Sequence, residues 1–131
     1  MEQKLSIHED DVEETQLPGR KLRWLVRPDT TGSEFCAVNM VRLNPNTTVT
    51  PAHSHEASEE IIYIISGSGE VLIDGKVYPI RTGSVVLFPK KSIHRLRNSG
   101  KEEMKVICFF APPTDISEYI FHEGVEFPNQ L

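Results

Sequence analysis

Short strand-like segments, each closed by a turn signal, fill most of this 131-residue chain. The clearest is residues 70–78, where Asp74-Gly75 separates two apolar runs and predicts a β-hairpin with a two-residue turn. Residues 61–65 are β-branched or aromatic throughout, which is typical of a buried strand. No stretch before residue 112 has sustained helical periodicity. Together these features predict an all-β barrel or sandwich.

Proline-containing turns divide the chain into three parts. Residues 1–20 are rich in acidic side chains and end at Leu17-Pro18-Gly19, so we expect an N-terminal arm there. Residues 21–112 hold the strand-like segments and form the predicted barrel, whose length fits one domain. Residues 113–131 follow the pair Pro112-Pro113, and we expect them to pack on the outside of the barrel as a short helix or an arm.

Charge and hydropathy limit the classes of partner. The net charge of -5 argues against nucleic acid, because binding phosphate groups needs a basic surface. No apolar run reaches membrane-spanning length, so no membrane partner is expected. The start of the chain has no secretory pattern, which predicts a cytoplasmic protein. Cys36 and Cys108 form neither a zinc knuckle nor a redox motif, so both are expected to be free thiols.

Two histidines stand two residues apart just before the strand at 61–65. On an extended backbone His53 and His55 leave the same face, so one strand can offer two nitrogens to one ion. Glu60 and His94 complete a candidate set of four ligands. Glu59 is the rival carboxylate, but side-chain alternation puts Glu59 and Glu60 on opposite faces, so only one of them can point inward.

The spacing of these residues is similar to two motifs of one protein family. The first motif, G-x5-H-x-H-x3-4-E-x6-G, is matched by His53, His55, Glu60 and Gly67. The second motif, G-x5-P-x-G-x2-H-x3-N, is matched by Gly83, Pro89, His94 and Asn98. The chain therefore resembles the cupin superfamily, whose members are small jelly-roll β-barrels. Thr47 and Lys91 stand where the motifs have glycine, and the turn at Lys91 either changes type or holds a strained lysine.

The resemblance implies a metal centre. Its ligands would be His53, His55, Glu60 and His94. Three imidazoles and one carboxylate suit one divalent transition metal, which could be Mn, Fe, Ni, Cu or Zn, whereas calcium and magnesium would want more oxygen. Glu60 is preferred to Glu59 because Gly67 then keeps the spacing of the motif. His8 and His122 lie in the terminal segments and are expected at the surface.

Strand parity predicts the walls of the site. The residues that share parity with the inward-facing ligands, and should line the cavity as packing, are Ile62, Ile64 and Leu96. Arg95 and Arg97 have the opposite parity and are expected to face outward. For the last strand the sequence leaves two inner sets open, Cys108 with Phe110 or Ile107 with Phe109.

An open metal position can bind a carboxylate, a keto-enol or a sugar by its oxygens, which favours an enzyme acting on a small organic molecule. By resemblance the reaction classes are those of dioxygenases, decarboxylases, isomerases and lyases. The alternative is a non-catalytic module that binds or senses a metal and a small ligand. A polar residue aimed at the open position from another strand would favour the enzyme. Arg42 is the one charged candidate in the preceding strand, and an exposed strand arginine is its simpler interpretation.

The resemblance also implies an oligomeric state. Small cupins commonly dimerise by packing their barrels together and exchanging terminal arms. Residues 1–20 would serve as such an arm, so a homodimer is expected.

Overall fold

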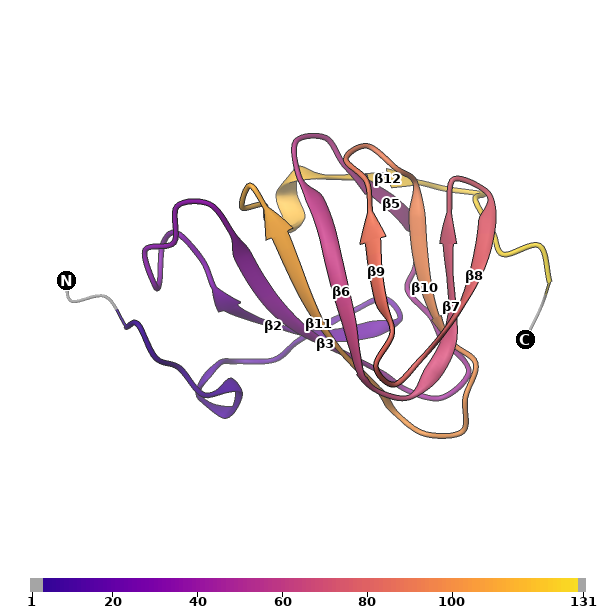
Figure 1. Ribbon diagram of the computed structural model, residues 1–131, viewed down its shortest axis with the longest axis horizontal. Helices are drawn as coiled ribbons and strands as arrows, with labels where there is room; N and C mark the ends of the chain where they lie inside the picture. The colour runs from indigo at the N-terminus through magenta and orange to yellow at the C-terminus, as the bar shows by residue number, and fades with distance from the viewer. Residues whose placement is uncertain (1–3, 130–131) are drawn as a thin grey trace.

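The computed structural model describes residues 4–129 and is built almost entirely from β-strands (Figure 1). The first sheet contains β1 (Thr15–Leu17), β2 (Arg20–Val26), β3 (Ala37–Leu43), β6 (Glu59–Ser66), β9 (Val85–Phe88) and β11 (Met104–Ala111). The second contains β4 (Thr47–Thr48), β5 (Ala52–His55), β7 (Ser68–Ile73), β8 (Lys76–Arg81), β10 (His94–Asn98) and β12 (Tyr119–His122). Two short 3-10 helices, η1 (Glu9–Asp11) and η2 (Ile116–Glu118), complete the described chain. No helix within residues 4–129 is long and apolar enough to cross a membrane.

Every ladder in the two sheets is antiparallel. The first sheet has the order β1-β2-β3-β11-β6-β9, and the second has the order β12-β5-β10-β7-β8 with β4 paired to β10. Strands that are neighbours in sequence often lie in different sheets, so the chain passes back and forth between the two layers (Figure 1). The all-β prediction is confirmed.

The turns follow the local sequence signals. Asp74 and Gly75 both have positive φ, 48° and 84°, as a two-residue hairpin turn between β7 and β8 requires. Gly67 has a φ of 105°, and a Cβ added there would lie 2.9 Å from Met104 Cα, so the motif glycine is needed for space as well as for conformation. Lys91 has a φ of 70°, so the turn keeps the left-handed backbone and holds a strained lysine.

The core lies between the two sheets and follows strand alternation. On β11 the buried residues are Met104, Val106, Cys108 and Phe110, which decides between the two inner sets that the sequence left open. On β6 the buried residues are Glu60, Ile62 and Ile64. Burying one large apolar side chain in such a core contributes about 1.5–3 kcal/mol. The apolar strand at 61–65 is thus buried on one face only, because nothing among the described residues covers its other face.

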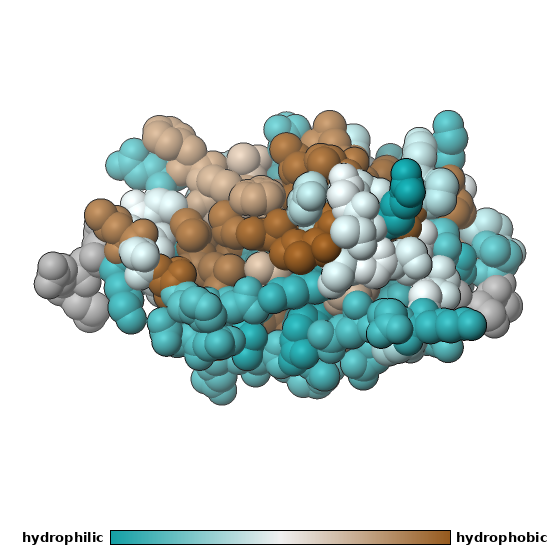
Figure 2. Space-filling view, turned by 60° about the horizontal axis from the view of Figure 1, so that its bottom comes forward, coloured by the Kyte–Doolittle hydropathy of each residue, from teal (hydrophilic) through white to brown (hydrophobic). Residues whose placement is uncertain are grey.

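That other face forms an exposed apolar patch across β6, β9 and β11. The patch consists of Ile61, Tyr63, Ile65, Val85, Leu87 and Phe109. Hydrophobic residues gather in one region of the face shown in Figure 2, bounded by a hydrophilic belt. A contiguous apolar surface of this kind commonly marks an interaction site.

The N-terminal segment lies against its own barrel. Its strand β1 pairs with β2 of the barrel. Glu9 contacts Lys105 at 2.6 Å, and Glu14 contacts Arg42 at 2.5 Å. These partly exposed ion pairs contribute about 0–1 kcal/mol each, so they position the segment more than they stabilise the fold. The residue boundaries expected for the N-terminal arm (1–20) and the barrel (21–112) stay predictions.

The C-terminal segment adds a strand and then covers one sheet. β12 pairs with β5 and forms the edge of the second sheet, and the following residues cross the outer face of β10. Arg95 donates from Nη1 to Val125 O at 3.0 Å, and Arg97 donates from Nη1 to Asn129 O at 2.8 Å. Both arginines are 4% exposed. They lie on the outward face of β10, as parity predicts, but the tail buries them, which local alternation could not reveal.

Candidate metal centre

Four side chains from three strands meet at one end of the barrel interior. They are His53 and His55 from β5, Glu60 from β6 and His94 from β10. One potential ligand atom from each lies within 4.8 Å of the others, and all four residues are buried. His53 and His94 are paired across the β5–β10 ladder, which places the two imidazoles side by side. Glu59 is exposed, so Glu60 is the carboxylate that the β6 pleat aims inward.

Backbone carbonyls orient two of the imidazoles. Nδ1 of His94 lies 3.0 Å from Ser92 O, and Nδ1 of His53 lies 3.4 Å from Pro51 O. A ring whose Nδ1–H donates to a carbonyl keeps a free lone pair on Nε2, as metal-binding histidines require. Within the described residues, buried Nε2 of His94 has no hydrogen-bond partner and lies 3.3 Å from Glu60 Oε1. This unsatisfied inward-facing nitrogen fits a metal ion.

The electrostatics of the cluster match the same role. Burial lowers the pKa of His53 well below its usual value, and nearby His94 lowers it further, so the imidazole is neutral. Burial alone would raise the pKa of Glu60, but the hydrogen bond with His55 and the nearby His94 imidazole outweigh this and hold the pKa below the usual range. Neutral imidazole and ionised carboxylate are the forms that bind a metal ion.

A cavity of about 50 Å³ opens directly in front of the cluster, with room for a few water molecules. Its apolar walls are Leu22, Val41, Val49, Ile62, Phe88, Leu96 and Phe110. Two of the three residues predicted as lining, Ile62 and Leu96, are in this wall. The third, Ile64, is fully buried in the core and does not contribute to the cavity surface.

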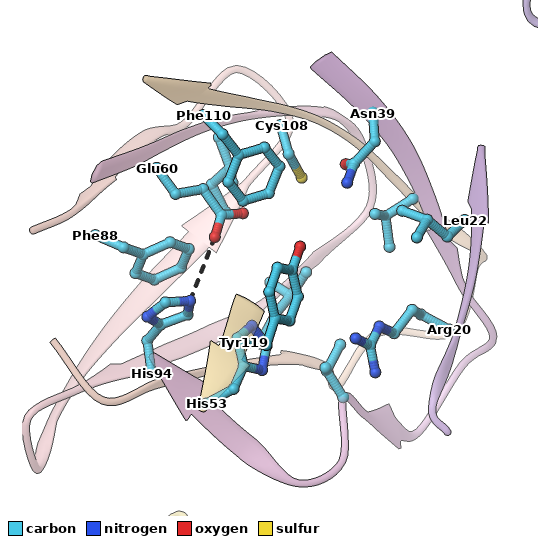
Figure 3. A pocket seen from close by; sticks show the side chains of 14 residues that line it. Arg20, Leu22, Asn39, His53, Glu60, Phe88, His94, Cys108, Phe110 and Tyr119 are labelled. Atoms are coloured by element: carbon cyan, nitrogen blue, oxygen red, sulfur yellow. Dashed lines mark ion pairs between the residues drawn. The ribbon is translucent and has the colours of Figure 1, made fainter. Parts of the chain in front are cut away.

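Three polar residues that the sequence did not single out also face this cavity: Arg20, Asn39 and Tyr119 (Figure 3). The Tyr119 ring stacks on His53 with centroids 5.1 Å apart, and burial raises the pKa of its hydroxyl well above the usual value. Asn39 could have been found from parity, since it alternates with buried Ala37 and Val41 along β3. Tyr119 and Arg20 could not, because each stands in a segment expected outside the barrel.

The other candidate residues lie away from the cavity. The Arg42 guanidinium points outward and binds Glu14 and Glu103. His8 is exposed, with 70% of its side chain accessible. The His122 ring contacts Ser54 Oγ at 2.8 Å and is absent from the His/Glu cluster.

A family model described as "Cupin domain" matches residues 39–110, which is more than half of the chain. This match contains both histidine motifs and all four residues of the cluster. The chain belongs to the cupin family. The resemblance drawn from the two motifs is thereby confirmed.

Several proteins resemble this cupin over most of their length. Protein SchB of Streptomyces halstedii is 37% identical over 105 residues, which are 79% of this chain and 74% of SchB. An L-ectoine synthase of Aliivibrio fischeri is 31% identical over 106 residues, which are 79% of this chain and 78% of the synthase. The structure of the polyketide cyclase RemF from Streptomyces resistomycificus matches with a TM-score of 0.71 and 21% identity, covering 94% of this chain and 88% of RemF. The likeness to RemF shows that the two proteins share a fold.

Proposed function

We propose that this cupin is a metal-dependent enzyme of lyase or isomerase type that moves a proton beside the carbonyl group of a small organic molecule. The observation that carries the proposal is the Tyr119 hydroxyl, which projects into the cavity in front of the His/Glu cluster (Figure 3). Proton-transfer catalysis needs such a group beside the bound substrate, whereas a site that only binds a metal does not. The similarity to L-ectoine synthases, which are named as enzymes, supports the same conclusion.

His53, His55, Glu60 and His94 would hold one divalent transition metal, because the donor set suits Mn, Fe, Ni, Cu or Zn. When bound, such an ion polarises a carbonyl oxygen as a Lewis acid. The protein supplies the remaining requirements. Phe88 and Phe110 give the cavity apolar walls, and electrostatic interactions are stronger beside such walls than in bulk water.

Tyr119 is the proposed proton donor. Its phenol is protonated at neutral pH, because burial raises the pKa of the hydroxyl even above its usual value of 10.0. Stacking on His53 and an edge contact with His55, with centroids 4.3 Å apart, fix the ring. The hydroxyl is therefore held in one position and does not have to be ordered when the substrate arrives.

Turnover by the Tyr119→Phe variant tests this role. Protein loaded separately with each of the five metals is incubated in D2O with a panel of small oxo and hydroxy compounds, and substrate loss or exchange of α-protons is followed by ¹H NMR. We expect the variant to be about 10²- to 10⁴-fold slower, because one positioned proton donor is lost, while its metal content stays unchanged. Tyr78→Phe, on exposed β8, removes the same hydroxyl outside the cavity and should leave the rate unchanged.

Oxygen consumption measured in parallel separates the reaction classes. Turnover without oxygen uptake agrees with the proposal. Uptake of dioxygen in proportion to substrate would contradict it in favour of a dioxygenase. If the protein binds metal and ligand but turns over no compound with any of the metals, the alternative of a non-catalytic binding module would be correct instead.

We also propose that two copies of the chain associate through the exposed apolar patch. Nothing within residues 4–129 covers the outer face of β6 and β9, so a two-fold packing of this face against its copy would bury the patch of each chain against the other. The N-terminal segment does not compete for this face, because its ion pairs hold it against Lys105 and Arg42 of the same barrel.

Light scattering coupled to gel filtration tests the association. The wild-type protein is expected to run as a dimer at micromolar concentration, and Val85→Lys/Leu87→Lys as a monomer, because two unpaired charges would have to be desolvated in the interface. Phe35→Lys changes an equally apolar residue that is 80% exposed outside the patch, and it should leave the dimer intact. A monomeric wild type would contradict the proposal.

A further inference from the structure

We propose that the side of the cavity facing the His/Glu cluster is a carboxylate-binding subsite formed by Arg20 and Asn39, so that the substrate is a short-chain oxo or hydroxy acid. Because it names a class of substrate, this inference rests on the proposed function. The two parts of the cavity are separate in space. Figure 3 places Arg20 and Asn39 on one side and Glu60 and His94 on the other, with the Tyr119 hydroxyl between them.

Arg20 is an unpaired buried cation. It is 7% exposed, and its side chain donates one hydrogen bond among residues 4–129, from Nη1 to Pro18 O at 3.1 Å. The two other arginines buried to this degree each have a carboxylate, Arg95 with Glu126 at 2.5 Å and Arg97 with Glu70 at 2.7 Å. Arg20 has no carboxylate partner in the described part of the chain. A buried guanidinium without one is costly, so an anion supplied from outside would satisfy it.

Asn39 is the second, independent sign of a ligand. It is 1% exposed, lines the cavity, and its Oδ1 has no hydrogen-bond partner within residues 4–129. Buried polar atoms are rarely left unsatisfied, and those that are commonly point to a missing partner. A side-chain amide has both donors and an acceptor, so it can bind a carboxylate oxygen and also accept from a hydroxyl group.

The charge and the size of the cavity further limit which ligands can bind. In the metal-free site Arg20 and Glu60 carry opposite charges but form no ion pair, and a divalent ion would bring the net charge of the cavity to +2. An organic acid offsets this positive charge with its carboxylate, and its oxo or hydroxyl oxygen can face the His/Glu cluster. The cavity of about 50 Å³ admits only a small ligand, and Leu22 and Val41 provide an apolar wall for its carbon chain.

Binding of pyruvate tests the subsite without depending on turnover. [1-¹³C]Pyruvate is titrated into Zn²⁺-loaded protein and followed by ¹³C chemical shift. We expect Arg20→Gln to weaken binding about 10- to 100-fold, because a charge-assisted bidentate contact is lost. Arg20→Lys should bind pyruvate with intermediate affinity, since lysine keeps the charge but lacks the planar guanidinium that contacts both carboxylate oxygens. Arg23→Gln is the matched control on the same strand, because Arg23 interacts with Asp10 and Glu14 instead.

Methyl pyruvate and inorganic phosphate complete the test. Methyl pyruvate keeps the carbonyl but lacks the charge, so it should bind weakly and equally to wild type and Arg20→Gln. Phosphate that competes as well as pyruvate would overturn the carboxylate assignment, and so would pyruvate affinity unchanged by Arg20→Gln. If Arg20→Gln does not fold, as judged by circular dichroism, Asn39→Ala replaces it and should weaken pyruvate more than methyl pyruvate. Arg20-dependent binding with no turnover of any acid would defeat the proposed function and leave this subsite standing.

Discussion

The double variant His53→Ala/His94→Ala is expected to lose its metal. Of the four residues in the cluster these two come from neighbouring strands, and their backbone-anchored Nδ1 atoms leave Nε2 facing the site. A four-ligand site binds with roughly 10–16 kcal/mol, so removing half of the ligands should weaken affinity by about 10⁴-fold or more. Elemental analysis of protein purified without added metal, followed by equilibrium dialysis against Zn²⁺ or Mn²⁺, measures the loss.

His8→Ala is the control for this variant, because His8 is an exposed histidine at the far end of the chain. It should bind about one ion per chain, as the wild type does. The stability of the fold gives a second readout, since an ion that binds only the native state raises the unfolding midpoint, and the increase grows with the logarithm of the ion concentration. Unchanged metal content in the double variant would remove the site assignment, whereas a shift in midpoint restricted to wild type and His8→Ala would support it.

The parts of the fold predicted best are those that depend on near neighbours in sequence. His53 and His55 share a face because they are two apart on β5, and Asp74-Gly75 makes its turn from its own backbone preferences. Alternation along β6 likewise turns Glu60 inward and Glu59 outward. In each case the period of two is enough, since a strand has only two faces.

The parts that the sequence did not reveal depend on contacts between distant segments. Tyr119 reaches the cavity because β12 pairs with β5, which brings residue 119 opposite His55. Arg20 reaches it as the first residue of β2, although the Pro-Gly turn beside it resembles the end of a loose arm. Arg95 is buried by residues about 30 positions later. Parity places each side chain on a face but does not say what covers that face.

Asn98→Asp is expected to cost about 3–5 kcal/mol of the free energy of unfolding. Asn98 is fully buried at the end of β10, where its Nδ2 donates to the carbonyls of Leu43, Asn44 and Glu102 at 2.9–3.1 Å. Its Oδ1 accepts from Gly100 N at 3.0 Å. An aspartate of the same shape keeps only the last contact and turns a charged oxygen toward three carbonyl oxygens.

Urea unfolding followed by circular dichroism measures this cost, and the matched control is Asn46→Asp. Asn46 is exposed and has a φ of 55°, a left-handed conformation that aspartate also tolerates, so the same chemical change there should alter stability by no more than about 0.5 kcal/mol. Domains of this kind are stable by about 5–15 kcal/mol, so Asn98→Asp removes a large share of the total. Equal midpoints for the two variants would mean that Asn98 does not join β10 to the turns after β3 and before β11.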